Sequence, residues 1–89
     1  MLEHRDLGKV MVKLPPQVRA KYDVWVSIVR VSGPHGLRSI KGFHDEALSG
    51  KWAGHRSSRL NQQWRLLYRV EEAAVRVVVD RVTPHDYRK

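Results

Sequence analysis

The 89-residue sequence predicts an α+β fold: a short N-terminal strand, an antiparallel pair of helices and a small antiparallel sheet, packed as one domain over residues 1–89. Two observations predict it. Apolar residues recur at helical spacing in the first third of the chain, and from about residue 55 they alternate with polar residues as in strands. Breaks rich in Gly, Pro or polar residues separate these segments and give the order strand, two helices, three strands.

Two helices are expected between residues 6 and 33, after a very short strand at residues 1–4. Asp6 is a suitable N-cap for the first helix, and the prolines of "LPPQ" end it because they cannot continue the hydrogen-bond ladder. Pro16 suits the first turn of the second helix, which is expected to run to about residue 31, before Gly33 and Pro34. The apolar faces comprise Leu7, Val10, Met11 and Leu14 in the first helix, and Val18, Tyr22, Trp25, Val26 and Val29 in the second.

The rest of the chain is expected to be a loop followed by three strands. "GLRSIKGFHDEALSGKWAG", residues 36–54, is punctuated by glycines and is predicted to be a loop with one helical turn near Leu37. Strands are expected at about residues 55–60, 64–70 and 75–82, separated by the polar turns "NQQ" and "EEAA". The result is a three-stranded meander.

The central strand predicts a sheet with one apolar and one cationic side. Alternate residues from Trp64 to Val70 are apolar, whereas Arg65 and Arg69 fall on the other side. A three-residue connection pairs Leu60 with Trp64 and Arg59 with Arg65, which keeps the apolar residues together against the helices. Arg59, Arg65 and Arg69 are then expected to gather on the solvent side of the sheet, which we call the cationic face.

Charge and composition indicate which kinds of partner and cofactor the protein can have. Seventeen Lys and Arg against nine Asp and Glu give a net charge of +8, a field that attracts nucleic acid or another polyanion. There is no cysteine, which excludes disulfides and thiolate metal sites. No segment approaches the ~20 apolar residues of a spanning helix, and the N-terminus lacks a signal-peptide core. A cytoplasmic protein without a membrane partner, metal or cofactor is expected.

Two interpretations of the cationic face remain open. A solvated sheet face tolerates like charges at a cost of up to about 1 kcal/mol per pair. The other interpretation is a phosphate site, because a planar guanidinium matches two phosphate oxygens. The region from residue 47 to 70 carries five cations and no carboxylate, which favours phosphate. These cations are Lys51, Arg56, Arg59, Arg65 and Arg69.

The segment "SGKWAGHRSSRLNQQWRLLYRV", together with the terminal "TPHDY", resembles the RelE/ParE superfamily of toxins from toxin–antitoxin modules. The resemblance is strongest to the RelE, YoeB and HigB branch, and it covers nearly the whole chain. It implies a RelE-like fold and a metal-independent endoribonuclease that cleaves mRNA in the 30S A site of the ribosome and is silenced by an antitoxin. The alternatives are a ParE-like inhibitor of DNA gyrase that cleaves nothing, and a basic RNA-binding module.

The resemblance also implies catalytic roles. Arg65, after the aromatic residue of the central strand, is expected to contact the scissile phosphate, with Arg59 helping from the neighbouring strand. His85 is placed like a C-terminal catalytic histidine and suits acid or base chemistry near neutral pH. Asp86 is either the base or a residue that orients His85, and Tyr87 is expected to stack on a base or orient the nucleotide.

Further residues are expected to bind RNA or to supply the general base. The expected RNA contacts are Lys51, Trp52, His55, Arg56 and Arg69. Trp52 is either a stacking platform or the edge of the core, and His55 either touches RNA or faces water. The segment "FHDE" offers His44, Asp45 and Glu46 as alternative bases, and a merely solvated loop is an equal alternative.

Overall fold

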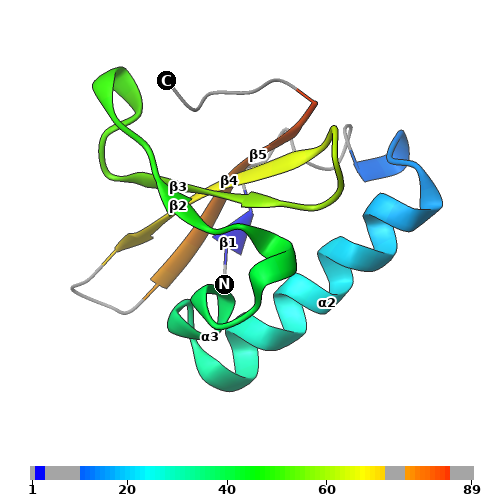
Figure 1. The fold of residues 1–89 in the computed structure, drawn as a ribbon, viewed down its shortest axis with the longest axis horizontal. Helices are drawn as coiled ribbons and strands as arrows, with labels where there is room; N and C mark the ends of the chain where they lie inside the picture. The colour runs from blue at the N-terminus through cyan, green and yellow to red at the C-terminus, as the bar shows by residue number, and fades with distance from the viewer. Residues whose placement is uncertain (1, 4–10, 72–75, 85–89) are drawn as a thin grey trace.

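The structure, a computed structural model, describes residues 2–3, 11–71 and 76–84 (Figure 1). The sheet in these ranges has five strands in the order β1-β5-β4-β3-β2. β1 runs parallel to β5, and the other neighbours are antiparallel. The α+β class is therefore confirmed. The elements are β1 (Leu2–Glu3), α2 (Pro16–Ser32), α3 (His35–Arg38), η1 (Lys41–Phe43), β2 (Glu46–Ala47), η2 (Gly50–Trp52), β3 (His55–Arg59), β4 (Arg65–Glu71) and β5 (Arg76–Thr83).

The long helix α2 begins and ends where the sequence predicts. Pro16 occupies its first turn, where the missing N–H costs no hydrogen bond. Gly33 ends it with a φ of 73°, a conformation that glycine adopts without strain, and its N–H donates to the carbonyl of Val29 at 2.9 Å. The predicted apolar face is buried except at Val26, which is half-buried, and Trp25 has 0% exposure.

Only the end of the expected first helix lies within the described residues. Met11 and Val12 have helical backbone, and Leu14 joins the core. The expected helix from residue 6 to 10 lies outside the described residues. The expected strand at residues 1–4 is present as β1.

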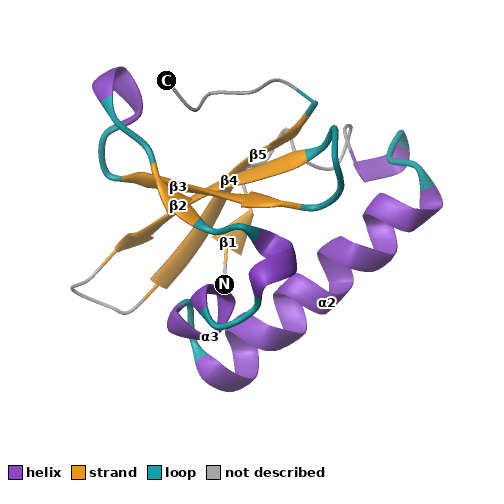
Figure 2. Cartoon of the chain, viewed as in Figure 1, coloured by secondary structure: helices purple, strands orange, loops and turns teal. Residues whose placement is uncertain are grey.

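The helices α2 and α3 lie on one side of the sheet (Figure 2). The core cluster lies between them and the sheet. Trp25 stacks on Tyr22 and meets the ring of Tyr68 edge-on, with centroids 6.3 and 5.2 Å away. The aromatic residues therefore join α2 to β4. The cluster comprises Leu14, Val18, Tyr22, Trp25, Val29, Leu37, Phe43, Leu60, Leu66, Tyr68, Val77, Val79 and Val82.

The predicted turn between β3 and β4 is confirmed. Arg59 is the register partner of Arg65, and the N–H of Leu60 donates to the carbonyl of Trp64 at 2.8 Å. Asn61 closes the turn, because its side-chain oxygen accepts from the N–H groups of Gln63 and Trp64 at 2.8 and 2.6 Å. This turn chemistry holds the two arginines opposite one another.

The expectation that the cationic face is solvated is wrong at Arg65 and at Leu67. Arg65 is 8% exposed and Leu67 is 0% exposed. Leu48 and Val78 are also buried but lie outside the main core cluster, so this side of the sheet carries a small apolar layer of its own.

The helical turn expected near Leu37 is present as α3, but the rest of the expected loop at residues 36–54 is wrong in part, because it contains β2 and the short helices η1 and η2. β2 pairs antiparallel with β3 through Glu46–Ser57 and Ala47–Arg56. A strand of two residues has no periodicity to detect, so only its pairing defines it.

A bulge in β5 determines which residues of this strand lie on the cationic face. Leu67 pairs with Arg81, but Tyr68 pairs with Val79, so Asp80 is an extra residue. The bulge lets Val79 and Val82 both reach the core while Asp80 and Arg81 share the cationic face.

Candidate functional site

Arg59 and Arg65 stand directly opposite one another on β3 and β4. The guanidinium of Arg65 is largely withdrawn from water and donates through Nη1 to the carbonyl of Gln63 at 3.1 Å. Among the described residues, Arg59 has no hydrogen-bond or ion-pair partner. Two adjacent guanidinium groups held this way are suited to bind one phosphate between them.

Asp80 organises the other end of the cationic face. Its Oδ2 accepts a hydrogen bond from Arg69 Nε at 3.1 Å and lies 2.9 Å from His55 Nε2. Because an ionised carboxylate only accepts, we infer that Nε2 carries the proton and donates it. Arg69 and His55, both predicted to bind RNA, are thus joined to an acid. Arg69 also lies 3.8 Å from Glu71.

Asp80 was not among the residues that the sequence predicted for the site. The sequence does contain a signal for it. Asp80 is the one carboxylate in "RVVVDRV", and the neighbouring predicted strand carries Arg65 and Arg69.

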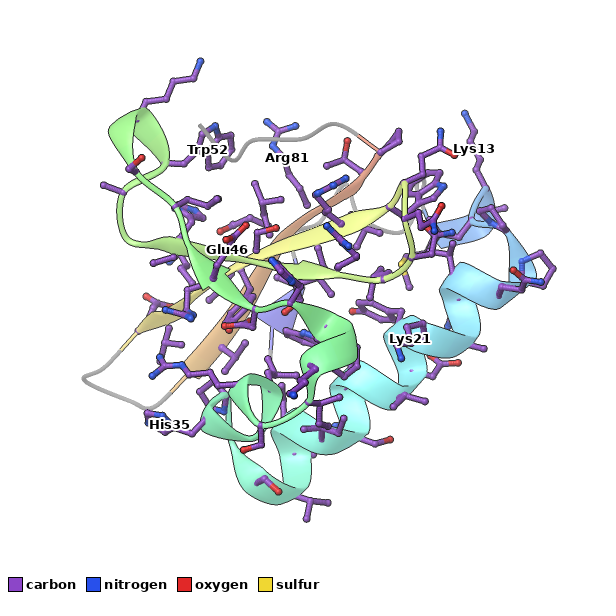
Figure 3. The ribbon with its side chains drawn as sticks, viewed as in Figure 1. Lys13, Lys21, His35, Glu46, Trp52 and Arg81 are labelled. Atoms are coloured by element: carbon purple, nitrogen blue, oxygen red, sulfur yellow. The ribbon has the colours of Figure 1, made fainter. Side chains whose placement is uncertain are left out.

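Trp52 lies at the end of η2 (Figure 3). Its ring meets His55 edge-on, with centroids 5.1 Å apart and planes at 89°. The guanidinium carbon of Arg81 lies 5.4 Å from the centroid of the indole ring, within cation–π range. Lys51, another expected RNA contact, is exposed on the same short helix. Trp52 is thus in contact with the cationic face and is not part of the main core.

Arg56 lies on the opposite side of the sheet from the other expected RNA contacts. Its Nε donates to Asp45 Oδ1 at 2.7 Å. Oδ2 of Asp45 accepts from Ser58 Oγ at 2.7 Å and from Tyr68 Oη at 2.6 Å, and Trp25 Nε1 donates to Ser58 Oγ at 3.0 Å. The Asp45 side chain is 0% exposed, so the expectation of a solvated loop is wrong at this residue. Asp45 joins the segment before β2 to the core.

Alkaline pH is expected to destabilise the fold through Tyr68. Burial and the hydrogen bond to Asp45 raise the pKa of Tyr68 well above the ordinary 10.0. The folded state therefore keeps a proton that the unfolded chain loses above about pH 10, so stability is full below that pH and falls as pH rises. The slope from this group reaches about 1.4 kcal/mol per pH unit.

Urea unfolding between pH 8 and 11 measures this dependence. Tyr68→Phe should remove the part of the slope that comes from this hydroxyl. Equal slopes for wild type and Tyr68→Phe would contradict the assignment.

The candidate bases lie at the β2 edge of the sheet. Glu46 is opposite Ser57 and so faces the cationic side, one row of side chains from Arg59. His44 is exposed, with a φ of 47°. Both line a pocket of about 340 Å³ with Arg38 and Lys41. His85, Asp86 and Tyr87 lie outside the described residues.

Across the residues that the structure places, no three His, Asp or Glu side chains come together as a metal site would require. None of the described helices has the length and apolar character needed to cross a membrane.

The fold is similar to that of several solved toxins. The YoeB/ParE toxin from Agrobacterium tumefaciens matches with a TM-score of 0.74 and 17% identity over 96% of each chain. The YoeB–YefM complex from Staphylococcus aureus matches with a TM-score of 0.72 and 15% identity, over 96% of this chain and 94% of that one. The archaeal RelE–RelB complex from Pyrococcus horikoshii matches with a TM-score of 0.71 and 19% identity, over 92% of this chain and 89% of that one.

No protein-family model and no curated protein sequence matches this chain. At these identities the structural likenesses show the fold, and they confirm the predicted resemblance to the RelE/ParE superfamily at that level.

Proposed function

We propose that this chain, which has the fold of the RelE/ParE toxins, is the toxin of a toxin–antitoxin module and cleaves mRNA in the ribosomal A site, in the cytoplasm. The observation that supports this most is the Arg59–Arg65 pair on the cationic face. An RNA phosphate matches two adjacent guanidinium groups in both charge and shape. Glu46 shares that face and supplies a nearby carboxylate.

The proposed reaction needs no metal. The 2′-oxygen of the ribose attacks the adjacent 3′ phosphate, its proton passes to a base, and the 5′-oxygen leaves with a proton from an acid. Arg65 and Arg59 stabilise the charge that develops on the phosphorus oxygens. We assign the base to Glu46, because it faces the same side as the arginines, and the acid to His85.

Asp86 and Tyr87 complete the proposed site. Asp86 orients His85, and Tyr87 stacks on the nucleotide. His44 is the alternative base. A Glu46→Gln variant that cleaves at the wild-type rate would shift the role of base to His44 or to the terminal residues.

The test is incubation of the purified chain with ribosomes programmed with a defined mRNA, followed by mapping of the new RNA 5′ ends. Discrete cuts within the A-site codon, absent without ribosomes, are expected. No cutting, together with inhibition of DNA supercoiling by gyrase, would instead identify a ParE-like inhibitor. No cutting and no effect on gyrase, with RNA binding retained, would identify a basic RNA-binding module.

The proposed partner is an antitoxin chain with acidic and amphipathic segments. Long-range attraction to the +8 charge speeds encounter, and apolar burial then holds the complex. Two of the solved structures with this fold, YoeB–YefM and RelE–RelB, are complexes. Co-expression with the chain encoded by the neighbouring gene is expected to yield a stable hetero-oligomer and to restore growth. Harmless, high-level expression of the chain by itself would contradict the toxin assignment.

A further inference from the structure

Trp52 is held in a fixed orientation by residues from three strands. Its ring packs edge-on against His55 of β3, and His55 bonds to Asp80 of β5, which also accepts from Arg69 of β4. The side chains of His55 and Asp80 are 20% and 15% exposed, so this support is largely shielded from water. An aromatic ring with this support needs no reordering to bind a flat ligand.

Arg81 covers the indole ring but is itself exposed. It lies on β5 opposite Leu67, and its guanidinium carbon is 5.4 Å from the centroid of the Trp52 ring. A long, exposed side chain can swing outward, so a flat group can enter between the guanidinium and the indole. Figure 3 shows Trp52 and Arg81 together on the side of the sheet away from Lys21 on α2.

The Arg59–Arg65 pair lies on the same side of the sheet as Arg81. Arg65 pairs with Thr83, two residues along β5 from Arg81, which is about 7 Å at the rise of a strand. That separation is comparable to the reach of one nucleotide from its phosphate to its base.

We propose that Trp52 and Arg81 form a nucleobase clamp, in which a base of single-stranded RNA stacks between the indole and the guanidinium while its phosphate lies at Arg59 and Arg65. This proposal rests on the proposed function, because that function makes RNA the ligand. It adds to that function a site that holds one base. Aromatic and guanidinium planes both stack on bases, and neither contact depends strongly on which base is present. The clamp therefore contributes affinity with little sequence preference.

The experiment compares RNA with and without bases. Fluorescence anisotropy of the full chain measures its affinity for labelled ten-residue 2′-O-methyl oligoadenylate and for an abasic oligomer with the same number of phosphates. Wild type is expected to bind the base-bearing oligomer about 5- to 150-fold more tightly, the range for one stacked base. Trp52→Leu should lose most of this preference and leave the affinity for the abasic oligomer unchanged.

Three matched variants separate stacking from charge and from folding. Trp52→Phe should keep most of the preference. Arg81→Gln, at an exposed position, should lower it without unfolding the chain. Lys51→Gln, which removes a charge from the same short helix, should weaken binding of both oligomers equally.

Two results would overturn the clamp. One is equal binding of base-bearing and abasic oligomers by wild type. The other is a preference that Trp52→Leu and Arg81→Gln leave intact, which would mean that the indole and the guanidinium do not hold the base. The binding assay does not depend on cleavage, because the oligomers are uncleavable and no ribosome is present. If the chain binds RNA through its bases but cuts no mRNA, the clamp is supported and only the proposed nuclease activity is rejected.

Discussion

Arg65→Gln is expected to slow mRNA cleavage on programmed ribosomes about 100- to 1,000-fold, the effect of removing one charged donor from a transition state. Arg65 faces Arg59 across the β3–β4 pair, so the substitution removes half of the proposed phosphate site. The measurement is the single-turnover cleavage rate. Arg65→Lys should recover only part of the rate, because an ammonium keeps the charge but not the two-pronged geometry.

The burial of Arg65 requires a control for folding. The side chain is 8% exposed and donates to the carbonyl of Gln63, so Arg65→Gln should also cost about 1 kcal/mol of stability. Thermal unfolding of each variant shows how much folded protein the assay contains. Arg30→Gln removes the same charge from an exposed position on α2 and should cleave at the wild-type rate. Wild-type cleavage by folded Arg65→Gln would reject the assignment.

Asp45→Ala is expected to lower the free energy of unfolding by about 3 kcal/mol, the low end for breaking a buried ion pair. Three donors lose their acceptor, namely Arg56 Nε, Ser58 Oγ and Tyr68 Oη. The low end applies because the side chain of Arg56 keeps 23% exposure and can recover some hydration. For a domain of this size, such a loss lowers the Tm by at least about 10 °C.

Asp23→Ala is the matched control, because Asp23 is 63% exposed and forms only a surface pair with Arg19. It should change the free energy of unfolding by less than about 0.5 kcal/mol. Urea unfolding at neutral pH compares the two variants. If Asp45→Ala proved as stable as Asp23→Ala, the buried cluster around Asp45 would not be important to the fold.

Sequence periodicity was sufficient to predict α2, the three long strands and the pairing of Arg59 with Arg65. Each of these follows from which side of a helix or strand a residue faces, and that is a local property of the backbone. The turn at Asn61 is local too, because its hydrogen bonds reach only two and three residues along the chain. The resemblance to the RelE/ParE superfamily also rested on sequence alone, on residues 49–70 together with the terminal "TPHDY".

The same alternation could have placed Arg56 correctly. Arg56 is two residues from Ser58 and so shares its side of β3, toward the helices. Counting the arginine together with Arg59 and Arg65 by charge alone was the error. The residue type shows only that a side chain is cationic. Its position in the strand determines which side of the sheet it faces.

The partners of Asp45 and Asp80 were decided by the tertiary structure alone. Asp45 meets Tyr68 across 23 residues of sequence, and His55 meets Asp80 across 25. The second contact also depends on the bulge in β5, which turns Asp80 onto the cationic face beside Arg81. A local sequence pattern does not show which distant residues come into contact, nor where a strand carries the extra residue of a bulge. The sequence therefore determined which residues carry charge, and the packing of the sheet decided which of those charges are neutralised by a partner and which remain open to a ligand.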